Sequence, residues 1–84
     1  MEVSFTLVAQ GAEDTLDDHS YNQLWDVIER ILEDPEYARR APWSEFVSTR
    51  KLYGTKVPGT DLTVYWAVEG DTLRVHVIAA DRGL

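Results

Sequence analysis

DLTVYWAVEGDTLRVHVIAA, residues 61–80, is the stretch that decides the fold of this chain. Apolar side chains alternate with others on both sides of Gly70-Asp71, which is the pattern of two half-buried strands. A glycine–aspartate pair between two such runs is typical of a two-residue hairpin turn. If Glu69 pairs with Thr72, the apolar residues share one face and a slip by one residue would separate them. The predicted pairs are Val68–Leu73, Ala67–Arg74, Trp66–Val75, Tyr65–His76 and Val64–Val77.

Upstream of the hairpin, the sequence predicts a strand followed by a helix. Glu2–Gln10 alternates and is expected to be a half-buried strand. Gly11–Asp18 is short and acidic, which indicates a loop. Apolar residues then recur every three or four positions over Tyr21–Glu33, the stripe of an amphipathic helix. Ser20, three residues before Gln23, is its expected N-cap.

The middle of the chain contains breakers and short elements. Asp34 is expected to cap a short helix that begins at Pro35 and ends at Arg40. Trp43–Val47 is ambiguous, and Ser44 could cap one further helical turn there; Ser48–Val57 is expected to be extended. Pro58-Gly59 predicts a turn. The whole is one α+β domain, residues 1–84: a small antiparallel sheet in the order strand-helix-helix-strand-strand-strand, with the helices packed on one face.

Composition and charge narrow the classes of function. The 84 residues are 44% hydrophobic and 27% charged and contain no cysteine, which excludes disulfides, thiolate metal sites and a cysteine nucleophile. The longest apolar run, Val64–Val68, is too short for a membrane span or a secretory signal, so we expect a cytoplasmic protein. Residues 1–36 carry a net charge of −9, residues 37–60 carry +4 and residues 61–84 carry −2. RNA is thus disfavoured as a partner and a protein favoured, although acidic residues also simply maintain solubility.

Neither a metal nor a cofactor is predicted. The two histidines, His19 and His76, have no ligand at the spacing of a zinc site. Asp14, Asp17 and Asp18 cluster near His19 but lack the glycine and the distal glutamate of a calcium loop, which favours a solvated acidic loop.

The polar face of the hairpin is the predicted catalytic site. Tyr65, His76 and Arg74 would lie within reach of one another, and the basic residues of the neighbouring strand, Arg50, Lys51 and Lys56, could join them. Such a group could bind a phosphodiester and transfer a proton through His76 or Tyr65. The alternative is an aromatic–histidine cross-strand pair that only stabilises the hairpin. Trp43, which follows a proline in an irregular segment, is either a core residue or an exposed anchor for a protein partner.

Three segments resemble the RelE/ParE toxin superfamily of bacterial toxin–antitoxin systems. Lys51–Gly54 resembles the family's Lys-Leu-x-Gly segment, Asp61–Trp66 its Asp-Tyr-Arg-Val-x-Tyr strand, and Thr72–Arg82 its last strand. The resemblance implies a small strand-helix-helix-strand-strand-strand fold, an antitoxin partner, and Lys51 and Arg82 as phosphate-contacting residues. Thr63 stands where the ribonuclease members place an arginine, and no residue occupies the place of their C-terminal tyrosine.

Three functions therefore remain open. The first is a toxin of a toxin–antitoxin system, which cleaves RNA as a metal-independent endoribonuclease or binds a target. The second is a non-enzymatic protein-binding module or inhibitor on the same fold, which the acidic N-terminal third and the departures from the family favour. The third is a compact enzyme that uses Tyr65 and His76. The sequence leaves the oligomeric state unknown.

Overall fold

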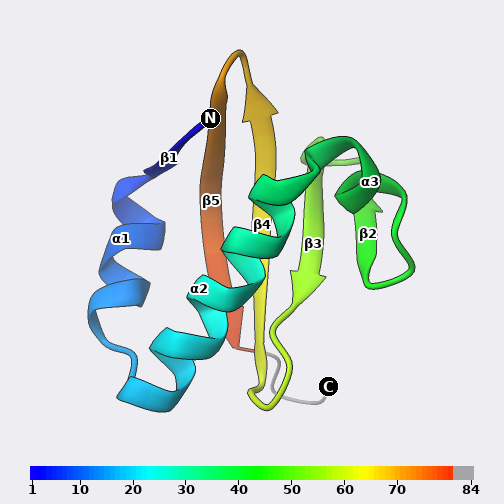
Figure 1. Ribbon diagram of the computed structural model, residues 1–84. Coiled ribbons are helices and arrows are strands. Elements are labelled where there is room, and N and C mark those ends of the chain that lie inside the picture. The colour runs from blue at the N-terminus through cyan, green and yellow to red at the C-terminus, as the bar shows by residue number, and fades with distance from the viewer. Residues whose placement is uncertain (81–84) are drawn as a thin grey trace.

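The computed structural model describes residues 1–80, which form a five-stranded sheet and three helices (Figure 1). The elements are β1 (Glu2–Phe5), α1 (Leu7–Asp14), α2 (Asp18–Glu33), α3 (Pro35–Arg40), β2 (Ser44–Val47), β3 (Leu52–Lys56), β4 (Leu62–Glu69) and β5 (Thr72–Ala80). The strand order is β1-β5-β4-β3-β2, antiparallel throughout except that β1 runs parallel to β5. The predicted α+β class, with helices packed against a small and mostly antiparallel sheet, is confirmed, with one helix and one strand more than expected.

The extra helix replaces the second half of the predicted N-terminal strand. The strand ends at Phe5, and the Thr6 side chain caps α1 by accepting from the amide of Ala9 at 3.1 Å. The Thr6 hydroxyl also donates to the carbonyl of His76, so the same residue ties the helix start to β5. The prediction of a strand to Gln10 is therefore wrong, and the loop predicted over residues 11–18 is confined to residues 15–17 between α1 and α2. The alternation could not reveal this helix, because α1 leaves Leu7 and Val8 exposed and buries only Ala9.

The amphipathic helix is confirmed as α2, but its N-cap is Asp17 and not Ser20. The Asp17 carboxylate accepts the backbone N–H of Ser20 at 2.8 Å, which lowers the pKa of Asp17 below its usual value of about 3.8. Asp34 caps α3 as predicted, accepting from the amide of Tyr37. None of the helices in the described part of the chain is long and apolar enough to cross a bilayer.

Residues 44–47 form strand β2 and not a further helical turn. Ser44 pairs with Thr55 and Phe46 pairs with Tyr53, so side-chain contacts across β2 and β3 replace local helical bonds. The extended segment predicted over 48–57 divides into a turn at residues 48–51 and strand β3.

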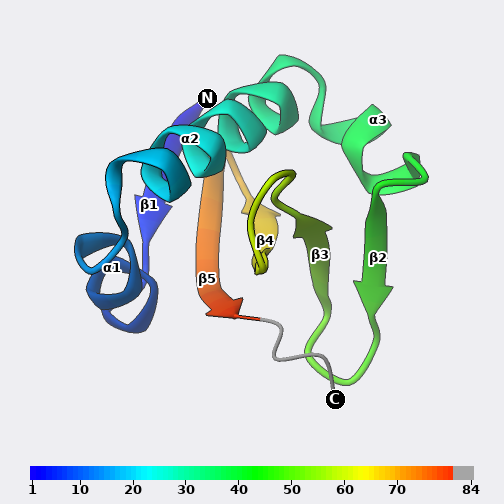
Figure 2. The same ribbon diagram turned by 90° about the horizontal axis from the view of Figure 1, so that it is seen from below.

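The core lies between α2 and one face of the sheet (Figure 2). Trp66 is fully buried, and its indole N–H donates to the hydroxyl of buried Thr55 at 2.9 Å. Tyr53 stacks on Trp66 with ring centroids 5.2 Å apart. The helix contributes Leu24, Val27, Ile28 and Ile31 to this core, and β4 and β5 contribute Leu62, Val64, Leu73, Val75 and Ile78.

Candidate functional site

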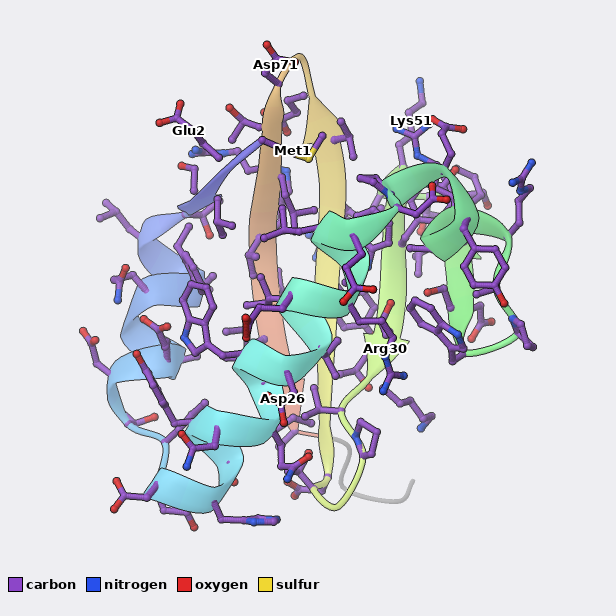
Figure 3. All side chains as sticks on the ribbon, viewed as in Figure 1. Met1, Glu2, Asp26, Arg30, Lys51 and Asp71 are labelled. Atoms are coloured by element: carbon purple, nitrogen blue, oxygen red, sulfur yellow. The ribbon has the colours of Figure 1, made fainter. Side chains whose placement is uncertain are left out.

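The candidate site lies on the sheet face opposite α2 and α3. Figure 2 shows these two helices on one side of the sheet and α1 beside the β1–β5 edge. The strand residues that alternate with core positions point to the other side, among them Tyr65, Arg74 and His76. Figure 3 shows all the described side chains on the ribbon.

The hairpin confirms the first part of the predicted register and corrects the second. Gly70 has a φ of 63° at the turn, and the pairs from Glu69–Thr72 to Trp66–Val75 are as predicted. The ladder is then irregular: Tyr65 pairs with Val77 and Val64 with Ile78, so His76 is an extra residue in β5. Such a β-bulge lets Ile78 enter the core while His76 and Val77 stay outside it. The prediction that Tyr65 lies opposite His76 is wrong.

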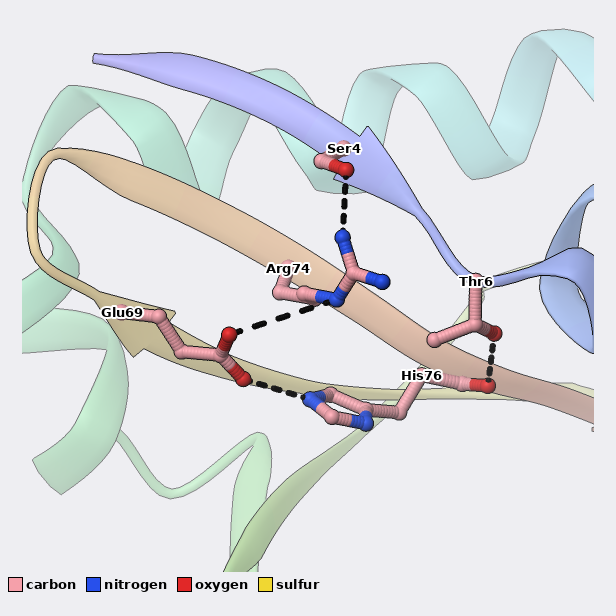
Figure 4. A network of polar contacts seen from close by, with 5 residues as sticks. All are labelled: Ser4, Thr6, Glu69, Arg74 and His76. Carbon is pink, nitrogen blue, oxygen red and sulfur yellow. Dashed lines mark hydrogen bonds and ion pairs between the residues drawn. The ribbon is translucent and has the colours of Figure 1, made fainter.

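His76 and Arg74 do come together, through a carboxylate that the sequence reasoning missed. Figure 4 shows Glu69 contacting both: one oxygen lies 2.8 Å from Nε2 of His76 and the other 4.0 Å from Nε of Arg74. Arg74 also donates from Nη1 to the hydroxyl of Ser4 on β1 at 2.7 Å. The signal for Glu69 was present, because in the predicted register it is the diagonal neighbour of Arg74 on the same face.

Tyr65 belongs to a separate part of this face, an open pocket of about 840 Å³. Its ring leans over Gly54 of β3, away from the hairpin end to which the ring of His76 points. Lys56 of β3 lines the same pocket as Tyr65, and its predicted role in binding a phosphate stays a prediction. The pocket is also lined by Pro42, Trp43, Ser44, Glu45, Val47, Pro58, Thr63, Ala79 and Ala80.

The other predicted basic residues do not line this pocket. Arg50 and Lys51 are exposed in the turn between β2 and β3, where Lys51 has a left-handed φ of 56°. Arg82 lies outside the described residues. Within residues 1–80, no group of three or more histidine and acidic side chains is arranged to hold a metal ion.

Trp43 lies between the core and the surface. It packs partly buried against the core, with the Arg30 guanidinium 5.5 Å from its ring centroid and the Tyr37 ring 6.4 Å away. It also lines the pocket on the opposite side of the sheet from α2. Both readings of this tryptophan, core residue and contact for a partner, fit that position.

The fold has counterparts among solved structures. A YoeB/ParE toxin from Agrobacterium tumefaciens superposes with a TM-score of 0.75 at 12% identity, over 95% of this chain and 98% of that chain. A RelE–RelB complex from the archaeon Pyrococcus horikoshii OT3 gives a TM-score of 0.73, also at 12% identity, over 99% of this chain and 97% of that chain. No protein-family model and no curated protein matches the sequence. The chain thus has the RelE/ParE-like toxin fold, as its motifs predicted.

Proposed function

We propose that this chain is a toxin-like protein of a toxin–antitoxin system that acts in the cytoplasm by binding a protein target, without cleaving RNA. Its fold is that of RelE/ParE-like toxins, one of which is solved as a complex with RelB. An antitoxin protein is accordingly the proposed partner that restrains it.

The observation that carries this proposal is the position of Glu69. A phosphodiester site needs cationic groups with unsatisfied charge, whereas the Glu69 carboxylate contacts both His76 and Arg74. The net charge of −7 further opposes the approach of a polyanion. The face is therefore better suited to a protein surface than to RNA.

The separation of Tyr65 from His76 supports the same conclusion. General acid–base cleavage requires the proton donor and acceptor to reach the same reacting atoms. Here the β-bulge offsets the two residues, with the Tyr65 ring over Gly54 and the His76 ring directed to Glu69. Thr63, on the same strand, offers no charge to stabilise a phosphorane-like transition state.

The test is inducible expression combined with site variants. We expect wild-type protein to arrest growth, and co-expression of the product of the neighbouring gene to relieve the arrest. His76→Ala and Tyr65→Phe should arrest growth equally well, and the purified protein should leave single-stranded RNA and the messenger RNA on translating ribosomes intact. Folded variants that lose the arrest, together with RNA cleavage in EDTA, would favour the metal-independent endoribonuclease.

A second candidate is a non-enzymatic inhibitor on the same fold. It is favoured by the charge of −9 on residues 1–36, which include β1, α1, α2 and the start of α3 and would attract a basic protein. Harmless expression of the wild-type chain would reject the toxin and leave this inhibitor.

A further inference from the structure

Strand β2 forms an open edge of the sheet. Among residues 1–80, β3 is the only strand hydrogen-bonded to it, so one side of β2 presents backbone N–H and C=O groups without a strand partner. Figure 2 shows β2 at the outer limit of the sheet, whereas α1 lies beside the opposite edge. This edge is able to pair with another chain.

The side chains of β2 protect this edge only weakly. Soluble proteins commonly block an edge strand with proline, charged side chains, a bulge or a very short strand. Strand β2 has four residues and one charge, that of Glu45, but it contains no proline or lysine and pairs regularly with β3. Phe46 is 52% exposed, although its ring centroid lies only 5.1 Å from that of Tyr53. Glu45 and Val47 form part of the wall of the pocket on the other face. Both faces of an added strand would therefore meet side chains of this protein.

The charges around β2 indicate the chemistry of its partner. Arg40, at the end of α3, is exposed shortly before β2 begins, and Arg50 and Lys51 are exposed shortly after β2 ends. Glu45, within the strand, is the single acidic residue of the segment 37–60, whose net charge is +4. A complementary segment thus carries acidic residues at its ends and uncharged residues at its centre.

We infer that β2 accepts an extended, acid-flanked segment of the protein partner as a sixth strand of the sheet. The inference rests on the proposed function for the existence of that partner. Backbone hydrogen bonds to the open edge supply affinity, and alternate side chains supply specificity. On one face they lie beside Phe46, and on the other they reach the pocket next to Val47.

The test uses a synthetic peptide and amide chemical shifts of the full chain. The peptide has a Thr-Val-Thr-Val centre between two pairs of Asp, and its control carries pairs of Lys in place of Asp. We expect the acidic peptide to shift the amides of residues 44–47 most, and the basic peptide to bind at least fivefold more weakly. Equal binding of the two peptides, or shifts centred on β1, would overturn the inference.

Charge variants test the role of the flanking arginines. Arg40→Ala and Arg50→Ala should each weaken binding of the acidic peptide about threefold to fivefold, as expected for one exposed charge pair. Asn22→Asp on α2 changes the net charge by the same amount at an exposed position away from β2, and should leave the affinity within about twofold. An equal loss in all three variants would show that net charge, and not this edge, governs binding.

Proline variants test strand addition itself. Successive residues of a strand direct their N–H groups to opposite edges, so either Glu45 or Phe46 donates to the open side. Proline is introduced at whichever of these two residues donates to the open side. This variant should keep the fold, as judged by thermal unfolding, and should bind the peptide at least tenfold more weakly. Unchanged binding by the folded proline variant would reject strand addition. The growth-arrest assay does not use the peptide. Growth arrest by the wild-type protein without peptide binding at β2 would therefore reject strand addition and leave the proposed function intact.

Discussion

The ring of Tyr65 lies so close over Gly54 that a Cβ on the glycine would stand 2.9 Å from Cε1 of the ring and 3.2 Å from Cδ1. The two residues are cross-strand partners in β4 and β3. Glycine at this position lets the tyrosine ring lean across β3 and form part of the pocket wall.

Gly54→Ala is therefore expected to displace the Tyr65 ring and to lower the free energy of unfolding by about 1–2 kcal/mol. Urea unfolding measures the change. Introduced into a Tyr65→Ala background, the same substitution should cost much less, because the ring atoms that it meets are gone. If Gly54→Ala lowered the free energy of unfolding equally in the wild-type and Tyr65→Ala proteins, the strain would lie in the backbone of β3 and not in the contact with the ring.

Gly11→Ala, in contrast, should raise the free energy of unfolding. Gly11 lies within α1, and a Cβ there would meet no atom within 4 Å. Alanine restricts the unfolded chain and favours the helix, which is worth about 0.5–1 kcal/mol. We expect a higher thermal midpoint for this variant, and a lower midpoint would contradict the placement of α1.

Thr55→Val tests the polar contact inside the core. The Thr55 hydroxyl accepts from the buried indole of Trp66 and shares a 2.7 Å hydrogen bond with the hydroxyl of Ser44. Valine keeps the volume but leaves the indole N–H without its acceptor, at a cost of about 1–3 kcal/mol. Ser44→Ala spares the indole and should cost less in the same unfolding experiment. The reverse ranking would argue against the Trp66 contact.

Lys51→Gly tests both the turn and a predicted phosphate contact. Lys51 holds a left-handed φ of 56°, which is unfavourable for any residue with a Cβ by about 1 kcal/mol. Glycine removes that strain, so we expect stability to be retained or slightly increased. If this protein acts by binding a protein target, growth arrest by the variant should persist at least in part, because Lys51 is one of several exposed cations beside β2 and a single exposed charge contributes little to binding. Complete loss of arrest in a stable variant would support a phosphate-binding role for Lys51.

The cap of α2 predicts a dependence on pH. Because the folded-state pKa of Asp17 is lowered, its charged form stabilises the folded state at pH values above the unfolded pKa of about 3.8. This contribution is lost as the pH falls through the lower folded-state pKa. Asp17→Ser retains a capping oxygen that does not titrate. The difference in thermal midpoint between wild type and Asp17→Ser should therefore shrink below about pH 4, and a constant difference would show that the carboxylate charge plays no part.

The sequence by itself determined the elements whose local signals are strong enough to specify them. The apolar stripe fixed α2, Asp34-Pro35 fixed the start of α3, and Gly70-Asp71 fixed the hairpin turn. In each, short-range periodicity or a backbone preference specifies the structure without distant contacts. The motifs also indicated the RelE/ParE-like fold that the solved structures share.

Only the tertiary structure decided the site. The alternation of apolar residues along one strand cannot reveal a β-bulge. The extra residue at His76 depends on whether Val77 or Ile78 enters the core as the cross-strand neighbour of Val64. That packing choice separates Tyr65 from His76 and leaves His76 beside Glu69. Likewise, β2 is a strand because β3 lies beside it, and backbone pairing with a distant segment outweighs weak local preference in so short a stretch.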